Sequence, residues 1–355
     1  MKKLFIIDTV LQLLSAIELN LGNMKEDQID LFLSESMCDY GNIGQNFHVL
    51  QDLGFSNVYS FSWNSVQDKF IKKYPLLASN KACKKELELL IGGAVSSYDS
   101  ILTQNRFYPF FLFYKAVKVN NKRVEISCYD EGLDSYVKDK PSSPYKRYEK
   151  ILDKLFYYNP SHLIYQKIYL HCADLYMGEN PNIVEIERPN YSEQELNLIR
   201  KLFDINTQMS FKGKYIFLEE CPNTMKPSQS YINFENKIIS SFNPENLYFK
   251  KHPRAPKPQV KTTFFPFGAP FELCGLLGML DGATLISFGC TASFTSLFFS
   301  QKILKSIVFV DSPEITNSAM RSNANRVNSV FKKMHQIDDR LIVLSQIEDM
   351  KMNLK

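Results

Sequence analysis

The chain has 355 residues, of which 45% are hydrophobic and 23% are charged. These proportions are typical of globular proteins and exclude intrinsic disorder, and the length suffices for two domains that each bury a core. The formal net charge of +4 is too small an excess to predict nucleic-acid binding. The seven cysteines form no CxxC pair and no His/Cys cluster at ligand spacing, so we expect reduced thiols in a cytoplasmic protein.

The amino-terminal residues resemble a targeting segment only superficially. Met1-Lys2-Lys3 precedes an apolar run, but Asp8 interrupts that run and no small-residue cleavage site follows it. The longest weakly polar stretch, Glu272–Phe299, contains Asp281 and four glycines. A membrane span needs about 20 consecutive apolar residues. We therefore expect neither a signal peptide nor a transmembrane helix.

The first half of the chain alternates between extended and helical patterns. An apolar strand at Lys3–Asp8 is followed by a helix at Thr9–Leu21, which Gly22 closes. The alternation continues with strands expected at 29–33, 58–61, 100–103 and 123–129, and with helices expected near 44–53, within 69–91 and at 109–117. Strands that alternate with helices predict a parallel sheet with right-handed crossovers, and hence a Rossmann-like domain.

The middle of the chain is less regular. Expected here are an aromatic- and lysine-rich helix at 145–158 and extended pieces at 163–170 and 183–186. A helix is predicted at Ser192–Phe203, because Ser192 precedes Glu195 at the spacing of a capping box. The polar, aperiodic stretch 205–213 indicates a domain boundary, which we place between residues 210 and 211.

The second half repeats the alternation, with strands expected at 214–219, 246–249, 262–265, 283–287 and 306–310, and helices at 230–241, 271–280 and 291–299. Two Rossmann-like domains facing each other across a cleft form the GT-B architecture of many nucleotide-sugar glycosyltransferases. We therefore expect an α/β, GT-B fold with an acceptor-side domain at 1–210 and a donor-binding domain at 211–355. The last helix is a candidate to pack back on the first domain.

Two adjacent carboxylates end the fifth expected strand. Asp130 and Glu131, followed by Gly132, come directly after an alternating extended run, and ligands bind at the carboxyl edge of a parallel sheet. An ordinary solvated turn is the alternative interpretation of these three residues alone. A second polar segment, Lys250-Lys251-His252-Pro253-Arg254, follows the apolar run 246–249 and also ends at a strand edge. The presence of this second segment favours a functional site over a solvated turn as the interpretation of Asp130 and Glu131.

The order of three short motifs resembles that of the bacterial sialyltransferases, including the lipooligosaccharide and capsule (polysialyl-type) enzymes. Asp130-Glu131-Gly132 resembles their acidic motif, His252-Pro253 their HP motif, and Ser287–Ser293 their serine motif. The opening Asp8–Leu14 is similar to their TPLQLL start, with Val10 in place of the proline. The resemblance covers the whole chain in order and spacing.

The serine motif departs from the family pattern. Two adjacent hydroxyl residues usually end it, whereas this chain has Ala292-Ser293, so either Ser293 acts alone or Thr291 shares its role. The resemblance also suggests that Glu272 holds the ribose of CMP. The alternative is a first-turn carboxylate that complements the helix dipole.

The resemblance implies an inverting transferase that moves sialic acid from CMP-sialic acid to a terminal galactose or sialic acid of a bacterial surface glycan. No cofactor or metal is expected. His252 would protonate or hydrogen-bond the leaving phosphate, and one of Asp130 and Glu131 would be the base. Successive residues of an extended chain point in opposite directions, so only one carboxylate can face the cleft, and we favour Glu131. The expected donor-binding residues are Lys250, Lys251, Pro253, Glu272, Thr291 and Ser293.

The alternatives are a related transferase with another donor, CMP-Kdo or a pyruvyl donor, and a non-catalytic protein that binds glycans or nucleotides. The expected partners are a nucleotide-sugar donor and a glycan or glycolipid acceptor, without nucleic acid. A further candidate partner is the inner face of an anionic membrane. The chain could contact it peripherally through the loop 250–261, because this loop is basic. We interpret three histidines without acidic or cysteine neighbours at ligand spacing as structural or exposed: His162, His171 and His335.

Overall fold

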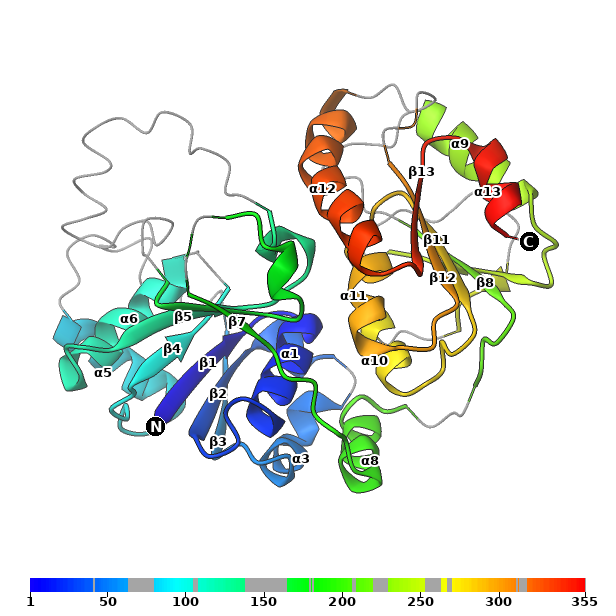
Figure 1. Cartoon of the computed structure of the whole chain (residues 1–355). Helices are drawn as coiled ribbons and strands as arrows, with labels where there is room; N and C mark the ends of the chain where they lie inside the picture. Colours follow the sequence, from blue (N-terminus) through cyan, green and yellow to red (C-terminus); the bar gives the residue numbers. More distant parts are fainter. Residues whose placement is uncertain are drawn as a thin grey trace. The chain divides into compact units, whose positions relative to one another are not determined.

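The computed structural model describes residues 1–40, 42–62, 80–104, 108–137, 165–178, 180, 182–205, 209–219, 229–252, 263–266, 270–310, 312 and 318–354. The chain folds into two compact units, each built on its own sheet (Figure 1). Unit 1 comprises Met1–Glu131, Lys138–Asp174 and Gly178–Asn206. Unit 2 comprises Gly132–Val137, Leu175–Met177 and Thr207–Lys355.

Unit 1 is a seven-stranded parallel sheet in the order β3-β2-β1-β4-β5-β6-β7. Its strands are β1 (Lys2–Ile7), β2 (Gln28–Ser34), β3 (Asn57–Phe61), β4 (Ser100–Leu102), β5 (Glu125–Tyr129), β6 (Lys167–Leu170) and β7 (Ile183–Glu185). The inner strands are continuous buried runs, because helices cover both faces of a parallel sheet. The strand order reverses between β1 and β4, which marks the switch point where such sheets bind ligands.

Capping boxes mark the start of two helices of unit 1. The helices of this unit are α1 (Val10–Leu21), α2 (Glu35–Cys38), η1 (Ile43–Gln45), α3 (Phe47–Asp52), α5 (Asn80–Ile91), α6 (Tyr108–Asn120) and α8 (Glu193–Leu202). The short helix η4 (Ala173–Leu175) begins in unit 1 and ends in unit 2. Helices α1 and α3 lie on one side of the sheet, and α5 and α6 lie on the other (Figure 1). The capping box predicted for α8 is confirmed, and α1 begins with another, formed by Thr9 and Gln12.

Unit 2 is a six-stranded parallel sheet in the order β10-β9-β8-β11-β12-β13, which again reverses beside its first strand. Its strands are β8 (Tyr215–Leu218), β9 (Leu247–Lys250), β10 (Thr263–Phe264), β11 (Thr284–Ser287), β12 (Lys305–Phe309) and β13 (Leu341–Leu344). Its helices are η2 (Leu133–Ser135), α9 (Gln229–Ser240), α10 (Phe271–Leu276), α11 (Thr291–Phe299), α12 (Ser318–Ile337) and α13 (Ile347–Asn353).

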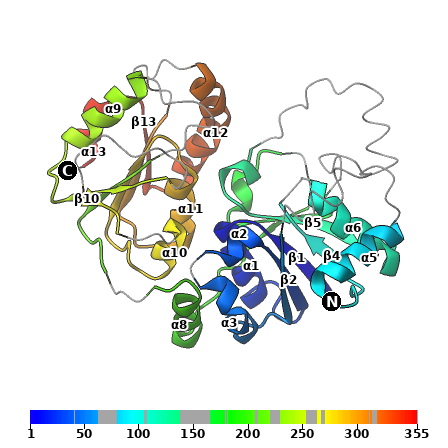
Figure 2. The same cartoon turned by 180° about the vertical axis from the view of Figure 1, so that it is seen from behind.

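One face of the second sheet carries a core rich in aromatic residues. Phe217 stacks on Phe249 at 5.6 Å between ring centroids, and Phe288 packs against Phe217. Ile347 and Met350 of α13 belong to this buried cluster. Figure 2 shows α9 and α13 on this side of the sheet. The last helix therefore contributes to the core of unit 2. Its packing on the first domain stays a prediction.

Two short segments of the amino-terminal half belong to unit 2. Tyr136 is fully buried, and its ring lies 5.1 Å from the ring of Phe294 and 6.2 Å from that of Phe298, both on α11. The backbone amide of Met177 donates to the Tyr136 carbonyl. These contacts bind 132–137 and 175–177 into unit 2. Local sequence patterns cannot predict these contacts, because the aromatic partners lie far away in sequence. The boundary between residues 210 and 211 stays a prediction.

The strands expected from the alternation are confirmed, most with shifts of one or two residues. Helix α10 ends at Leu276 rather than at 280, since Gly278 has φ +73° and turns the chain out of the helix. The helix expected at 145–158 lies outside the described residues. Among the described helices, none is both long and apolar enough to cross a membrane.

Candidate functional site

The residues singled out from the sequence lie at the carboxyl ends of strands in their respective units. Asp130 and Glu131 follow β5 of unit 1. In unit 2, Lys250 is the last residue of β9 and His252 follows it closely, while Thr291 begins α11 just beyond β11. Pro253 lies outside the described residues. Each unit thus carries polar side chains at the sheet edge where ligands of such folds bind.

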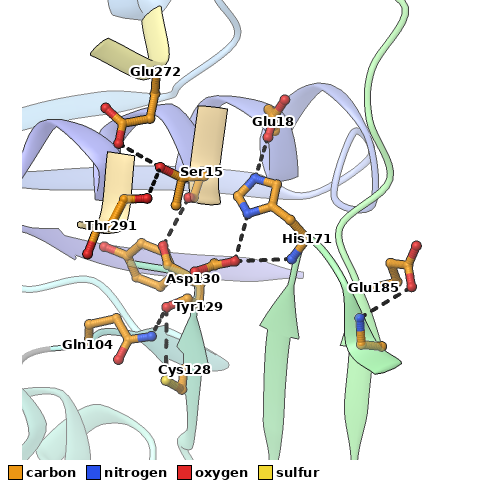
Figure 3. Close-up of polar contacts among 12 residues, drawn as sticks. Ser15, Glu18, Gln104, Cys128, Tyr129, Asp130, His171, Glu185, Glu272 and Thr291 are labelled. Atoms are coloured by element: carbon orange, nitrogen blue, oxygen red, sulfur yellow. Dashed lines mark hydrogen bonds and ion pairs between the residues drawn. The ribbon is translucent and has the colours of Figure 1, made fainter. Parts of the chain in front are cut away.

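Asp130 is completely buried and belongs to a charged cluster inside unit 1 (Figure 3). Its Oδ2 lies 2.8 Å from Nδ1 of His171 and accepts the backbone amide of His171 at 3.2 Å. The other ring nitrogen, Nε2, lies 2.6 Å from Oε2 of Glu18, which is also buried. Tyr191 makes a side-chain hydrogen bond to the same glutamate. One imidazole therefore bridges two carboxylates.

Two opposing effects set the charge of His171. Burial alone would lower the pKa of the imidazole, but the hydrogen bonds and the charges of Asp130 and Glu18 outweigh it and raise the pKa to about 10. His171 is therefore an imidazolium at neutral pH. The interpretation of His171 as a structural histidine holds. Its two partners are not predictable from local patterns, because Asp130 and Glu18 are 41 and 153 residues away in sequence.

The pH dependence of unfolding tests this cluster. His171→Gln should lower the free energy of unfolding at pH 6.5 by about 3–5 kcal/mol, because it leaves two buried carboxylates without their cation. The folded chain holds the proton up to pH about 10, whereas an unfolded histidine releases it near 6.5. The advantage of the wild type is thus complete below about pH 6.5 and shrinks toward pH 10. Denaturant unfolding of both proteins at pH 6.5, 7.5 and 8.5 measures it, and a constant difference contradicts the ion-pair account.

Glu131 takes a different direction from its neighbour. Its side chain is partly exposed, and its Oε2 accepts a hydrogen bond from Nε2 of Gln12 at 2.8 Å. Gly132 then adopts φ +112°, a backbone conformation that favours glycine. The structure thus turns Asp130 into the interior and leaves Glu131 as the accessible carboxylate of the two.

In unit 2, the backbone that carries His252 is anchored from the neighbouring strand. The backbone amide of His252 donates to Oε2 of Glu219 at 3.0 Å. Glu219 is the residue that directly follows β8. Burial raises the pKa of Glu219, although the His252 amide and the Lys251 charge oppose that shift. Glu235 on α9 is also buried, and burial together with the charge of Glu219 raises its pKa to about 7. Neither glutamate lies in a recognisable motif, so the sequence did not indicate them.

The two lysines at the end of β9 differ in their surroundings. Nζ of Lys250 lies 5.4 Å from the centroid of the Phe265 ring. Burial lowers the pKa of Lys250, and the charges of Cys274 and Glu272 partly oppose this. Lys251 is partly exposed and interacts with the charge of Glu219. Both lysines therefore remain candidates for binding an anion at this edge.

The serine motif shows which hydroxyl is accessible. Ser293 is completely buried, and its Oγ donates to the carbonyl of Cys290 at 2.7 Å. Ser306 in turn donates to the carbonyl of Ser293. Thr291, at the first position of α11, is partly exposed. The Ser293 hydroxyl thus holds the start of the helix, and Thr291 is the more accessible of the two hydroxyl residues. Donor binding by either residue stays a prediction.

Glu272 is also engaged within unit 2. It is 9% exposed, and Oγ1 of Thr295 donates to its Oε1 at 2.7 Å. The same threonine hydroxyl lies 3.0 Å from the carbonyl of Thr291, so this pair links α10 to the start of α11. Figure 3 labels both Glu272 and Thr291. Within the described part of the chain, no group of three or more His, Cys, Asp or Glu side chains could hold a metal ion.

No protein-family model matches the chain, and no curated protein matches it. Solved structures do. The glycotransferase of kitacinnamycin aligns with a TM-score of 0.50 and 8% identity, covering 97% of this chain and 86% of that one. Arabidopsis thaliana UGT89C1 complexed with UDP aligns with a TM-score of 0.49 and 7% identity, covering 97% of this chain and 85% of that one. E. coli heptosyltransferase WaaC with ADP aligns with a TM-score of 0.39 and 12% identity, covering 100% of both chains. At such identities the likeness concerns the fold, and the expected class, GT-B with two Rossmann-like α/β domains, is confirmed.

Proposed function

We propose that the chain is a glycosyltransferase that moves a sugar from a nucleotide-activated donor to a glycan acceptor. One observation carries this proposal: of two adjacent carboxylates at the carboxyl end of β5, Asp130 is buried in an ion pair and Glu131 is accessible. An accessible carboxylate at this edge of the sheet is suited to take the proton of an acceptor hydroxyl. The shared fold with the glycotransferase of kitacinnamycin supports the class of reaction.

The donor is CMP-sialic acid, and the acceptor is a terminal galactose or sialic acid of a bacterial surface glycan, modified in the cytoplasm. This assignment is supported by the order of the acidic, HP and serine motifs, which resembles that of the bacterial sialyltransferases. In this reaction Glu131 removes the proton of the acceptor hydroxyl as that oxygen attacks the anomeric carbon. The bond to the CMP phosphate breaks, and the configuration at the anomeric carbon inverts.

The departing phosphate gains negative charge, and unit 2 offers groups that stabilise an anion. His252 donates a proton or a hydrogen bond to it. The amides at the start of α11, with the hydroxyl of Thr291, present the positive end of a helix of nine residues. Lys250 and Lys251 add positive charge at the end of β9.

A second candidate keeps the reaction class and changes the donor, to CMP-Kdo or another activated sugar. A donor without CMP is favoured by the internal bonds of Glu272 and Ser293, which the family resemblance assigns to the CMP moiety. CMP-Kdo carries the same moiety as CMP-sialic acid, so these bonds do not separate those two donors. A binding protein without activity is a third possibility. It predicts ligand binding without turnover.

A donor panel tests the proposal. The purified chain is incubated with galactosides and, separately, with CMP-sialic acid, CMP-Kdo, UDP-sugars and ADP-sugars, and the products are identified by mass spectrometry. CMP release together with a sialylated product supports the proposal. Sugar transfer from another donor alone supports the second candidate, and no transfer from any donor contradicts the transferase assignment.

CMP should bind without added divalent metal, and Glu272→Gln should weaken that binding by at least about tenfold, because a carboxylate accepts ribose hydroxyls better than an amide does. Isothermal titration calorimetry in the presence of a chelator measures the affinity. Glu245→Gln is the matched control, since Glu245 is an exposed carboxylate of the same unit. Unchanged CMP affinity in Glu272→Gln would show that Glu272 serves only its bond to Thr295.

A further inference from the structure

The side-chain amide of Gln12 has one defined orientation. Gln12 is 2% exposed in the first turn of α1, and its Oε1 accepts the backbone amides of Asp8 at 2.7 Å and Thr9 at 3.3 Å. Oγ1 of Thr9 accepts the backbone amide of Gln12 in return. Because Oε1 must face these donors, Nε2 points the other way.

That nitrogen donates to Oε2 of Glu131 at 2.8 Å, across 119 residues of sequence. The bond connects the first turn of α1, which follows β1, with the end of β5, and β4 separates β1 from β5 in the sheet. It is a hydrogen bond to a carboxylate, a stronger class than bonds between neutral groups. A rigid donor therefore holds one oxygen of the proposed base.

Helix capping alone does not explain why this residue is glutamine. Glutamate and glutamine both complete a capping box, and α8 of the same unit uses Glu195 in the equivalent place, where it accepts the amide of Ser192. A glutamate at position 12 could cap α1 equally well, but it has no proton to donate and would repel Glu131. The amide is the feature that Glu131 requires.

The same face of α1 supports the whole turn. Ser15 and Glu18 follow Gln12 at intervals of three residues and lie on one side of the helix. Ser15 donates to the carbonyl of Asp130 at 3.0 Å, and Glu18 binds His171 (Figure 3). Successive turns of α1 thus contact the backbone of the acidic pair, the ion pair behind it and the accessible carboxylate.

We propose that Gln12 is a positioning residue for the reaction, holding the Glu131 carboxylate in the orientation that receives the acceptor proton. This inference rests on the proposed function. Gln12 is largely buried and acts through Glu131, so it should affect kcat and leave the KM of the donor nearly unchanged.

Two variants of the same capping box separate positioning from capping. Gln12→Glu keeps the cap but replaces the donor by a second carboxylate, whereas Thr9→Ala removes half of the cap and keeps the bond to Glu131. We expect both to lower the unfolding temperature by a few degrees, Gln12→Glu because its carboxylate repels that of Glu131 and Thr9→Ala because it removes a cap bond. Gln12→Glu should lower kcat by about 10- to 100-fold, while Thr9→Ala should stay within about threefold of wild type. Equal activity loss in both variants, or wild-type kcat in Gln12→Glu, overturns the proposal.

A second experiment measures stability instead of activity and exchanges the two residues of the contact. Gln12→Glu combined with Glu131→Gln reverses donor and acceptor, so the double variant should regain most of the unfolding temperature that Gln12→Glu loses. Absence of this coupling overturns the contact and the inference with it. Coupling in a chain that transfers no sugar from any donor supports the contact and contradicts the proposed function, so the two failures are distinguishable.

Discussion

We expect Glu131→Gln to reduce sugar transfer by about two to four orders of magnitude while CMP affinity stays within about twofold of wild type. Glutamine has nearly the same shape as glutamate but accepts no proton, and a positioned base contributes about 10²–10⁴-fold. Donor binding should persist, because the donor contacts are proposed on unit 2 and Glu131 belongs to unit 1. Initial rates and calorimetry with CMP measure the two quantities.

The matched control is Asp130→Asn, which changes the adjacent carboxylate. Asp130 is buried against His171, so this variant should lower the unfolding temperature and retain part of the turnover. The roles of the two residues must be exchanged if Asp130→Asn is inactive with normal unfolding and Glu131→Gln is active. If both variants keep full activity, neither carboxylate is the base.

His252→Ala should lower kcat by about two to four orders of magnitude and leave the fold intact. The reason is that the imidazole is proposed to act on the departing phosphate, whereas the loop is anchored by the backbone amide of His252 on Glu219. Alanine keeps that amide. The side chain can therefore be removed without removing the anchor.

The informative comparison is Glu219→Gln, which weakens the anchor and keeps the imidazole. It should lower kcat less than His252→Ala does. Activity assays with both variants, together with their unfolding temperatures, separate the role of the imidazole from that of the backbone anchor. Turnover near the wild-type level in His252→Ala would remove His252 from the mechanism.

Local sequence patterns predict much of this fold for identifiable reasons. Apolar runs locate the strands from β1 to β12, and Ser192 with Glu195 locates the start of α8, because both signals depend only on neighbouring residues. Strand β13 (Leu341–Leu344) was not predicted. The opposite directions of Asp130 and Glu131 also follow from the alternation of an extended chain. These inferences need no knowledge of distant contacts.

The features that sequence reasoning missed depend on distant partners. The carboxylates that make His171 a buried cation come from α1 and from the end of β5. Gln12 belongs to a recognised opening motif, yet its partner is visible only once β1, β4 and β5 are assembled. Ser293 fits a motif by residue type, but its hydroxyl bonds to the carbonyl of Cys290, a local geometry that residue type does not reveal.

The most direct test of the account is the reaction of the wild-type chain with CMP-sialic acid and a galactoside, followed by proton NMR in the presence of a chelator. One experiment then reports CMP release, formation of the sialylated product and the configuration of its new bond. The account predicts equal amounts of CMP and sialylated galactoside, with the configuration opposite to that of the donor. Intact CMP-sialic acid after prolonged incubation, or a product that retains the donor configuration, would contradict it.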